Sequence, residues 1–131
     1  MAPIPINQTV TVGTSLAVIG VPLSLNGVGR DVSLEIKNTG SAALTAFKIQ
    51  RQFIDKGDWV DWLTNTDFDT ATGKCSASGG PSGNKVYALA AGAIAWIDFD
   101  PGAVVAVQFL AAAASATTLL LAGGARLERK E

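Results

Sequence analysis

The residues best suited to chemistry in this chain are five aspartates that lie close together in the sequence. They are Asp55, Asp58, Asp61, Asp67 and Asp69. Two carboxylates can hydrolyse a glycosidic bond when an apolar pocket raises the pKa of one and the other lies at a defined separation. Only Asp61, between Val60 and Trp62, has apolar neighbours on both sides, and the spacing identifies no partner for it. We therefore predict no catalytic residue in this cluster.

The same stretch has some likeness to a calcium-binding loop. Oxygen-bearing side chains alternate at Asn65, Asp67 and Asp69, as they do at the start of an EF-hand loop. However, Thr70 stands where that loop requires glycine, and Ser76 stands where it requires a bidentate glutamate. We favour the alternative, a solvated loop whose aspartates stabilise turns, over calcium binding by Asp67 and Asp69. No metal and no cofactor are predicted.

The chain contains no histidine and a single cysteine, Cys75. Catalysis by Ser-His-Asp or Cys-His groups, zinc sites built on histidine, and imidazole pH switches are therefore excluded. Cys75 has no second cysteine for an intrachain disulfide, and the serines and glycines that follow it predict a flexible loop. We predict that the protein is not an enzyme.

Trp59 and Trp62 lie three residues apart, so on a strand they face opposite sides. An exposed tryptophan on a β-sandwich can stack on a sugar ring, which makes a carbohydrate-binding or adhesion module the alternative function. The favoured interpretation is that both, with Trp96, cover the core or fill an interface between subunits.

The N-terminal residues are the best candidates for an interaction with a partner. They are Ala2, Pro3, Ile4, Pro5 and Ile6. The segment is apolar, and its two prolines favour an extended conformation, so docking it on a neighbour costs less chain entropy than ordering a flexible tail. The alternative is a frayed terminus or a first edge strand.

The composition favours a protein that associates with other subunits. Hydrophobic residues make up 48% of the chain and charged residues 16%, so low-charge surface must stay exposed on a small domain. Ten basic and eleven acidic residues give a net charge of −1, without a basic stripe. Nucleic-acid binding is therefore not expected, because it requires clustered positive charge.

The uncharged stretch over residues 101–125 is long enough to span a bilayer. We do not expect it to do so, because Gln108 and Thr117 interrupt it and its apolar residues follow period two. The first residues lack the positive start and cleavage site of a secretory signal, so none is predicted.

Period-two alternation is the clearest structural signal, and it occurs on both sides of two turns. Residues 31–37 alternate and resume alternating over 43–53, and residues 105–109 do so again over 117–121. Each pair predicts a hairpin with one face on a core. Helical propensity is confined to residues 110–116.

Other segments predict short strands and one long loop. The strands fall at residues 8–12, 15–21, 59–63, 85–89 and 93–99. Residues 64–84 are rich in small and polar residues and predict the longest loop. We predict an all-β, single-domain antiparallel β-sandwich of seven to nine strands, immunoglobulin-like or jelly-roll, with Greek-key connections. An extended arm over residues 1–6 precedes the sandwich at 7–127, and a charged tail follows at 128–131.

Three phrases carry a resemblance to a known family. They are VSLEIKNTGSAAL at residues 32–44, ALAAG at 88–92 and VAVQF at 105–109. They resemble the pattern of small immunoglobulin-like sandwich proteins in the virions of tailed bacteriophages, above all the decoration or cement proteins of the head. The likeness covers about residues 30 to 125.

The resemblance implies a non-enzymatic structural protein, often trimeric, that binds the major capsid protein or other virion subunits between capsomers. It implies a place on the capsid surface after synthesis in the host cytoplasm, with a tail or neck component as the other position in the particle. Such a protein would act by multivalent clamping, in which simultaneous contacts with several subunits raise the avidity.

Overall fold

The computed structural model describes residues 4–25, 30–69, 75–79, 86–102 and 104–127, and within them nine strands, one helical turn and one 3₁₀ turn. The strands are β1 (Ile4–Val12), β2 (Ala17–Ser24), β3 (Arg30–Asn38), β4 (Leu44–Gln52), β5 (Trp59–Leu63), β6 (Cys75–Gly79), β7 (Ile94–Phe99), β8 (Ala106–Ala113) and β9 (Thr117–Leu127). The turns are α1 (Asn65–Asp69) and η1 (Val86–Ala88). The expected all-β sandwich is confirmed.

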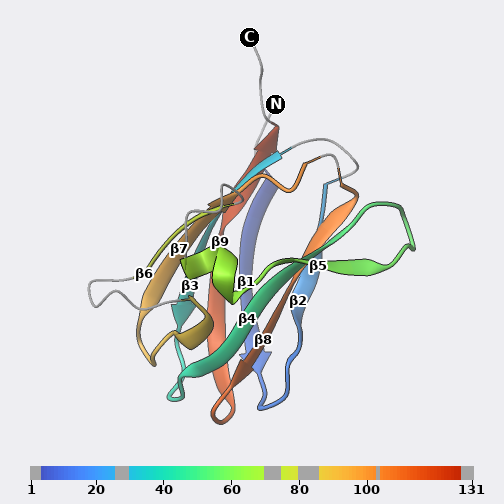
Figure 1. The fold of residues 1–131 in the computed structure, drawn as a ribbon. Coiled ribbons are helices and arrows are strands. Elements are labelled where there is room, and N and C mark those ends of the chain that lie inside the picture. Colours follow the sequence, from blue (N-terminus) through green and yellow to red (C-terminus); the bar gives the residue numbers. More distant parts are fainter. Residues whose placement is uncertain (1–3, 26–29, 70–74, 80–85, 103, 128–131) are drawn as a thin grey trace.

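Two antiparallel sheets face each other (Figure 1). Sheet A has the order β1-β9-β3-β7-β6, and sheet B has the order β2-β8-β4-β5. The pairs β1–β9, β2–β8, β3–β7 and β4–β5 are nested one inside the next, as if a long hairpin had been folded over itself. This nesting is the jelly-roll topology, with β6 added at one edge.

The two expected hairpins do not form. The segments 31–37 and 43–53 become β3 and β4, which lie in different sheets; β3 pairs with β7 and β9, while β4 pairs with β5 and β8. In the same way β8 and β9 belong to opposite sheets. Alternation shows that a strand has one face on a core, but two facing sheets share that core, so alternation does not identify the pairing partner.

The described residues of the expected N-terminal arm belong to a strand. Residues 4–6 belong to β1 and pair with β9 in the register Ile4↔Ala125 and Ile6↔Gly123. Ile6 is buried in the core, and Pro5 is exposed. This segment therefore begins the sandwich, and Pro5 is tolerated because β1 is an edge strand.

The described parts of the expected long loop contain two elements, α1 and β6. Residues 75–79 pair along the edge of sheet A with β7, so the prediction of a flexible loop there was wrong. Its small residues are compatible with an edge strand, which needs backbone pairing more than side-chain packing. The strand expected at residues 85–89 does not form, and residues 86–88 adopt η1 instead. The helical propensity noted at residues 110–116 is overridden over 110–113 by pairing in β8.

The core lies between the two sheets and is built mainly from the inward positions of the strands, with Leu25 and Leu89 added from the segments that follow β2 and η1. Its largest fully buried side chains are Phe47, Phe109, Leu25, Ile36, Ile49, Leu63, Leu89, Ile97, Leu119, Leu121, Val12 and Val32. In β7 the burial alternates as expected, with Ile97 and Phe99 inward and Trp96 outward. No helix in the described part of the chain is long and apolar enough to cross a membrane.

Candidate functional site

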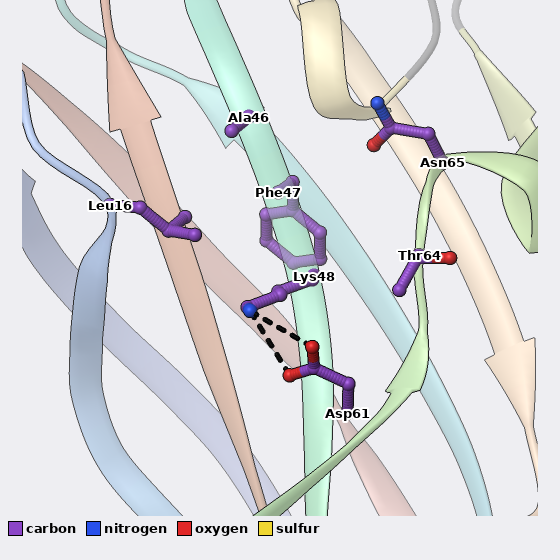
Figure 2. A pocket seen from close by; sticks show the side chains of 7 residues that line it. All are labelled: Leu16, Ala46, Phe47, Lys48, Asp61, Thr64 and Asn65. Atoms are coloured by element: carbon purple, nitrogen blue, oxygen red, sulfur yellow. Dashed lines mark hydrogen bonds and ion pairs between the residues drawn. The ribbon is translucent and has the colours of Figure 1, made fainter.

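A hollow of about 340 Å³ opens on the outer face of sheet B, and it is a candidate binding site in the described part of the chain. Its lining residues are Leu16, Ala46, Phe47, Lys48, Asp61, Thr64 and Asn65. They come from the approach to β2, from β4, from β5 and from the start of α1. Figure 2 shows Leu16 and Asn65 on opposite sides, with Lys48 and Asp61 together at one end.

The hollow exists because small side chains occupy the middle of this face. Ala46 on β4 lies opposite Ala112 on β8, and neither side chain rises far above the sheet. Strand β5 ends at Leu63, and the chain then turns into α1. This turn places Asn65 on the side of the hollow opposite Leu16. Leu16, just before β2, provides the other wall.

A line of hydrogen bonds fixes the polar end of the hollow. Gln108 Nε2 donates to Gln50 Oε1 at 2.7 Å, and Gln50 Nε2 donates to Asp61 Oδ1 at 2.7 Å. Lys48 Nζ forms an ion pair with Asp61, 3.0 Å from Oδ1 and 3.2 Å from Oδ2. Register places Gln108, Gln50 and Asp61 opposite one another on β8, β4 and β5, so all three project from the same face.

These contacts determine the charge state of Asp61. The Gln50 amide, and after it the Lys48 ammonium, donates to the carboxylate and holds the pKa of Asp61 below its ordinary value of 3.8. The side chain remains 54% exposed, so a ligand can reach it. At neutral pH the hollow therefore presents one carboxylate and one ammonium side by side.

Asp55, Asp58 and Asp67 do not line the hollow with Asp61. Asp67 is buried and acts as a helix cap: its Oδ2 accepts a hydrogen bond from the Thr64 backbone N–H at 3.0 Å. Alternate residues point to opposite sides of a helix, so the positions of Asn65 and Asp67 on α1 do not converge as the calcium-loop alternative requires. No group of three or more metal-ligating side chains occurs among the residues described.

The positions of the tryptophans differ from those that the sugar-stacking alternative requires. Trp62 is buried, with its ring edge-on to Phe99 at a centroid distance of 5.7 Å and with the Arg51 guanidinium 4.8 Å from its centroid. It therefore cannot stack on a ligand. Trp59 is half-buried on β5, whereas Trp96 on sheet A is 41% exposed.

Of the five residues expected to contact a partner, Ala2 and Pro3 lie outside the described residues. Ile4 pairs with Ala125, Pro5 is exposed, and Ile6 is in the core. Residues 4–6 are therefore part of the sheet and do not form a free apolar arm.

Exposed large apolar side chains instead gather around sheet B. We call six of them the sheet-B apolar set: Leu16, Val18, Val21, Phe53, Ile54 and Val60. They lie in β2 and its approach, in the β4–β5 turn, and in β5. Among the described residues, the only other large exposed apolar side chain is Trp96 on sheet A.

Sequence reasoning did not find the residues that surround Asp61. Lys48 and Gln50 sit at outward positions of β4, and Gln108 sits at an outward position of β8. A period-two pattern marks these positions as solvent-facing, but only the β8-β4-β5 order brings them together. Comparisons with protein-family models, curated proteins and solved structures find no match for this chain.

Proposed function

We propose that this protein is a non-enzymatic structural protein of a tailed-bacteriophage virion, a decoration protein that binds between capsomers and stabilises the head. The observation that carries the proposal is the concentration of exposed apolar side chains on the strands and turns of sheet B. Six of the seven large ones in the described structure belong to the sheet-B apolar set. The jelly-roll architecture, which is common in viral capsid proteins, is consistent with this role.

This concentration on one sheet distinguishes a contact surface from random exposure. Single exposed apolar residues are ordinary on any protein, whereas several on neighbouring elements indicate a region that another protein covers. Val21 and Ile54 are 68% and 69% exposed, so burial against a partner would remove most of their surface from water. Each such side chain contributes roughly 1 to 2 kcal/mol when it is fully covered.

In this proposal sheet B faces the shell, and the partner is the major capsid protein or a neighbouring virion subunit. The protein acts as an oligomer, for which we favour a trimer, so that several modest contacts form at once. Simultaneous engagement raises avidity by orders of magnitude without any stronger single contact. This arrangement requires no catalytic group, which agrees with a chain that contains no histidine.

The proposal is tested on particles that lack the protein, prepared from the virus that encodes it. Purified wild-type protein is added back, and the bound copies per particle are counted by quantitative mass spectrometry. We expect saturation at a fixed copy number that matches the shell, and at least a tenfold weaker attachment for the Val18→Asp/Val21→Asp variant.

The matched control places the same two charges on the opposite sheet. Thr9→Asp/Thr11→Asp changes two exposed positions of β1 on sheet A, and it should attach as the wild type does. Full attachment of the Val18→Asp/Val21→Asp variant would contradict the proposed docking face. A copy number of a few per particle would place the protein in the tail or neck instead of the shell.

A carbohydrate-binding or adhesion module is the second candidate, favoured by Trp96. This side chain projects from the outer face of sheet A opposite Glu35, and Ser33 Oγ donates to Asp98 Oδ1 at 2.6 Å in the adjacent row. An exposed ring beside polar groups suits a sugar ring. Quenching of tryptophan fluorescence by saccharides, abolished by Trp96→Ala, would support this candidate.

A further inference from the structure

We propose that the hollow on the outer face of sheet B binds a neutral pyranose ring, with Lys48 and Asp61 holding two adjacent hydroxyl groups. This site is separate from the Trp96 side chain, which lies on sheet A. It lies on the same sheet as the proposed shell-facing surface, and Leu16 belongs to both, so the sugar site is tested on the free protein.

The charges of the hollow select a neutral ligand. Lys48 and Asp61 compensate each other, with the ammonium 3.0 Å from the nearer carboxylate oxygen. An anion attracted to Lys48 would be repelled by the neighbouring Asp61, and a cation attracted to Asp61 would be repelled by Lys48. A hydroxyl group avoids this conflict because it donates and accepts.

Two adjacent sugar hydroxyls match this pair of groups. The carboxylate accepts from one hydroxyl, and the ammonium, which has three N–H donors, can donate to the other while keeping its ion pair. Charge-assisted hydrogen bonds of this kind are stronger than bonds between neutral groups. Side-chain exposures of 23% for Lys48 and 54% for Asp61 leave both within reach of a ligand.

The polar pair is held in place before any ligand arrives. Gln50 donates to Asp61 Oδ1, and Gln108, which is only 6% exposed, donates to Gln50 in turn. The carboxylate therefore has little freedom to lose when a ligand binds. A smaller loss of side-chain entropy on binding increases the affinity for a small, weakly binding ligand.

The rest of the hollow suits the carbon skeleton of the ring. Leu16 and Ala46 present apolar surface between the two ends, and the Asn65 amide lies opposite Leu16 (Figure 2). The Thr64 hydroxyl donates to Asp67 Oδ2 at 3.4 Å. The volume of about 340 Å³ falls at the lower end of the range for small-molecule sites.

The test measures saturation-transfer NMR on the full chain with four probes: the methyl glycosides of glucose, mannose, galactose and N-acetylglucosamine. We expect transfer to at least one probe, with a dissociation constant in the millimolar range. Asp61→Asn and Lys48→Met should each weaken binding about tenfold, because each removes one charged partner. Leu16→Ala should weaken it several-fold.

Two control variants separate this site from the other candidates. Trp96→Ala and Val21→Asp leave the hollow unchanged and should bind the sugar as the wild type does. Absence of transfer to all four probes would overturn the proposal. Binding that Trp96→Ala abolishes and Asp61→Asn preserves would also overturn it, and would assign the sugar to sheet A. Thermal melting of each variant verifies that it is folded.

The pH dependence supplies a second readout. Lys48 and Asp61 are the titratable side chains that line the hollow, and the pKa of Asp61 lies below 3.8. Asp61 is therefore ionised throughout the range from pH 5 to 8, and the affinity should be constant there. It should fall only below about pH 4, as the carboxylate gains a proton. A loss of affinity already at pH 6 would show that another group binds the sugar.

Discussion

At the scale of single residues, Asn38 has a large structural role that its place in an ordinary turn sequence does not indicate. It lies at the end of β3, fully buried, and all four hydrogen-bonding positions of its side-chain amide are used. Nδ2 donates to the carbonyls of Ala42 and Leu89, while Oδ1 accepts from Thr117 Oγ1 and from the Gly40 N–H. One side chain thus connects the β3–β4 turn, the segment after η1 and the start of β9.

Replacing Asn38 should therefore be costly. Asn38→Ala leaves several buried groups without partners, and we expect a loss of about 3 kcal/mol or more in the free energy of unfolding. Asn38→Asp should also destabilise, because a carboxylate cannot donate to the two carbonyls. Urea denaturation measures both.

Thr39→Ala is the neighbouring control, because Thr39 is exposed and, among the described residues, its hydroxyl forms hydrogen bonds with Thr118 alone. We expect a cost below about 1 kcal/mol for it. Equal costs for Asn38→Ala and Thr39→Ala would show that the buried amide has no special role.

Of the hydrogen-bonded residues at the polar end of the hollow, only Asp61 could be singled out from the sequence. Asp61 stands out in the sequence because apolar residues flank it. Its partners Lys48, Gln50 and Gln108 follow no motif, and they meet Asp61 only through the pairing of β8, β4 and β5. The aspartates near it in sequence, such as Asp67, are directed elsewhere.

At the scale of elements, β2 is an irregular edge strand that a side chain of β1 completes. Its register with β8 shifts between Ile19 and Leu23, and Gly20 within this interval has a φ of +69°. Gln8 reaches across from β1: its Oε1 accepts from the Val21 N–H at 2.9 Å, and its Nε2 donates to the Val21 carbonyl at 3.3 Å. The Gln8 amide thereby satisfies backbone groups of the irregular segment.

This arrangement predicts a coupling between positions 8 and 20. A Cβ at position 20 would overlap Gln8 Oε1, and the positive φ adds backbone strain, so Gly20→Ala should cost about 2 to 3 kcal/mol. Gly92→Ala is the matched control, because Gly92 has a φ of +79° but open space around it; it should cost about 1 kcal/mol.

A double-mutant cycle completes this test. In a Gln8→Ala background the overlap with Gln8 is absent, while Val10 Cγ1 still lies 3.0 Å from the added Cβ, so the cost of Gly20→Ala should fall toward that of Gly92→Ala. An unchanged cost, measured by thermal or urea denaturation, would show that Gln8 does not constrain position 20.

The strands themselves were largely predictable, and their pairing was not. The alternation at residues 31–37 and 43–53 correctly marked β3 and β4, because each strand has one buried face. The turn between them was interpreted as a hairpin, whereas the chain there crosses from one sheet to the other. The pattern of a single strand contains no information on partners that are distant in sequence, such as β9 for β3.

At the scale of the whole molecule, the nested pairing makes the N-terminal strand part of the core structure. Ile6 packs in the core, and the first residues of β1 pair with the last part of β9. Deleting residues 1–6 should therefore lower the free energy of unfolding by about 2 to 4 kcal/mol, through lost burial and lost strand pairing.

Denaturation of the truncated protein measures this loss, with Ile6→Ala as the point variant and Asn7→Ala as the exposed control. Ile6→Ala should account for much of the effect, and Asn7→Ala for little. An unchanged midpoint after truncation would restore the interpretation of these residues as a free arm.

The pairing of β1 with β9 also determines how the molecule responds to mechanical load. Ile4 lies opposite Ala125, so the outer ends of the first and last strands are neighbours in an antiparallel pair (Figure 1). Tension that separated these two ends would peel the ladder open one rung after another, because the rungs run perpendicular to the strands. Compression across the two sheets would instead meet a tightly packed interior. The molecule is therefore weak when pulled by its ends and stiff when squeezed between its faces.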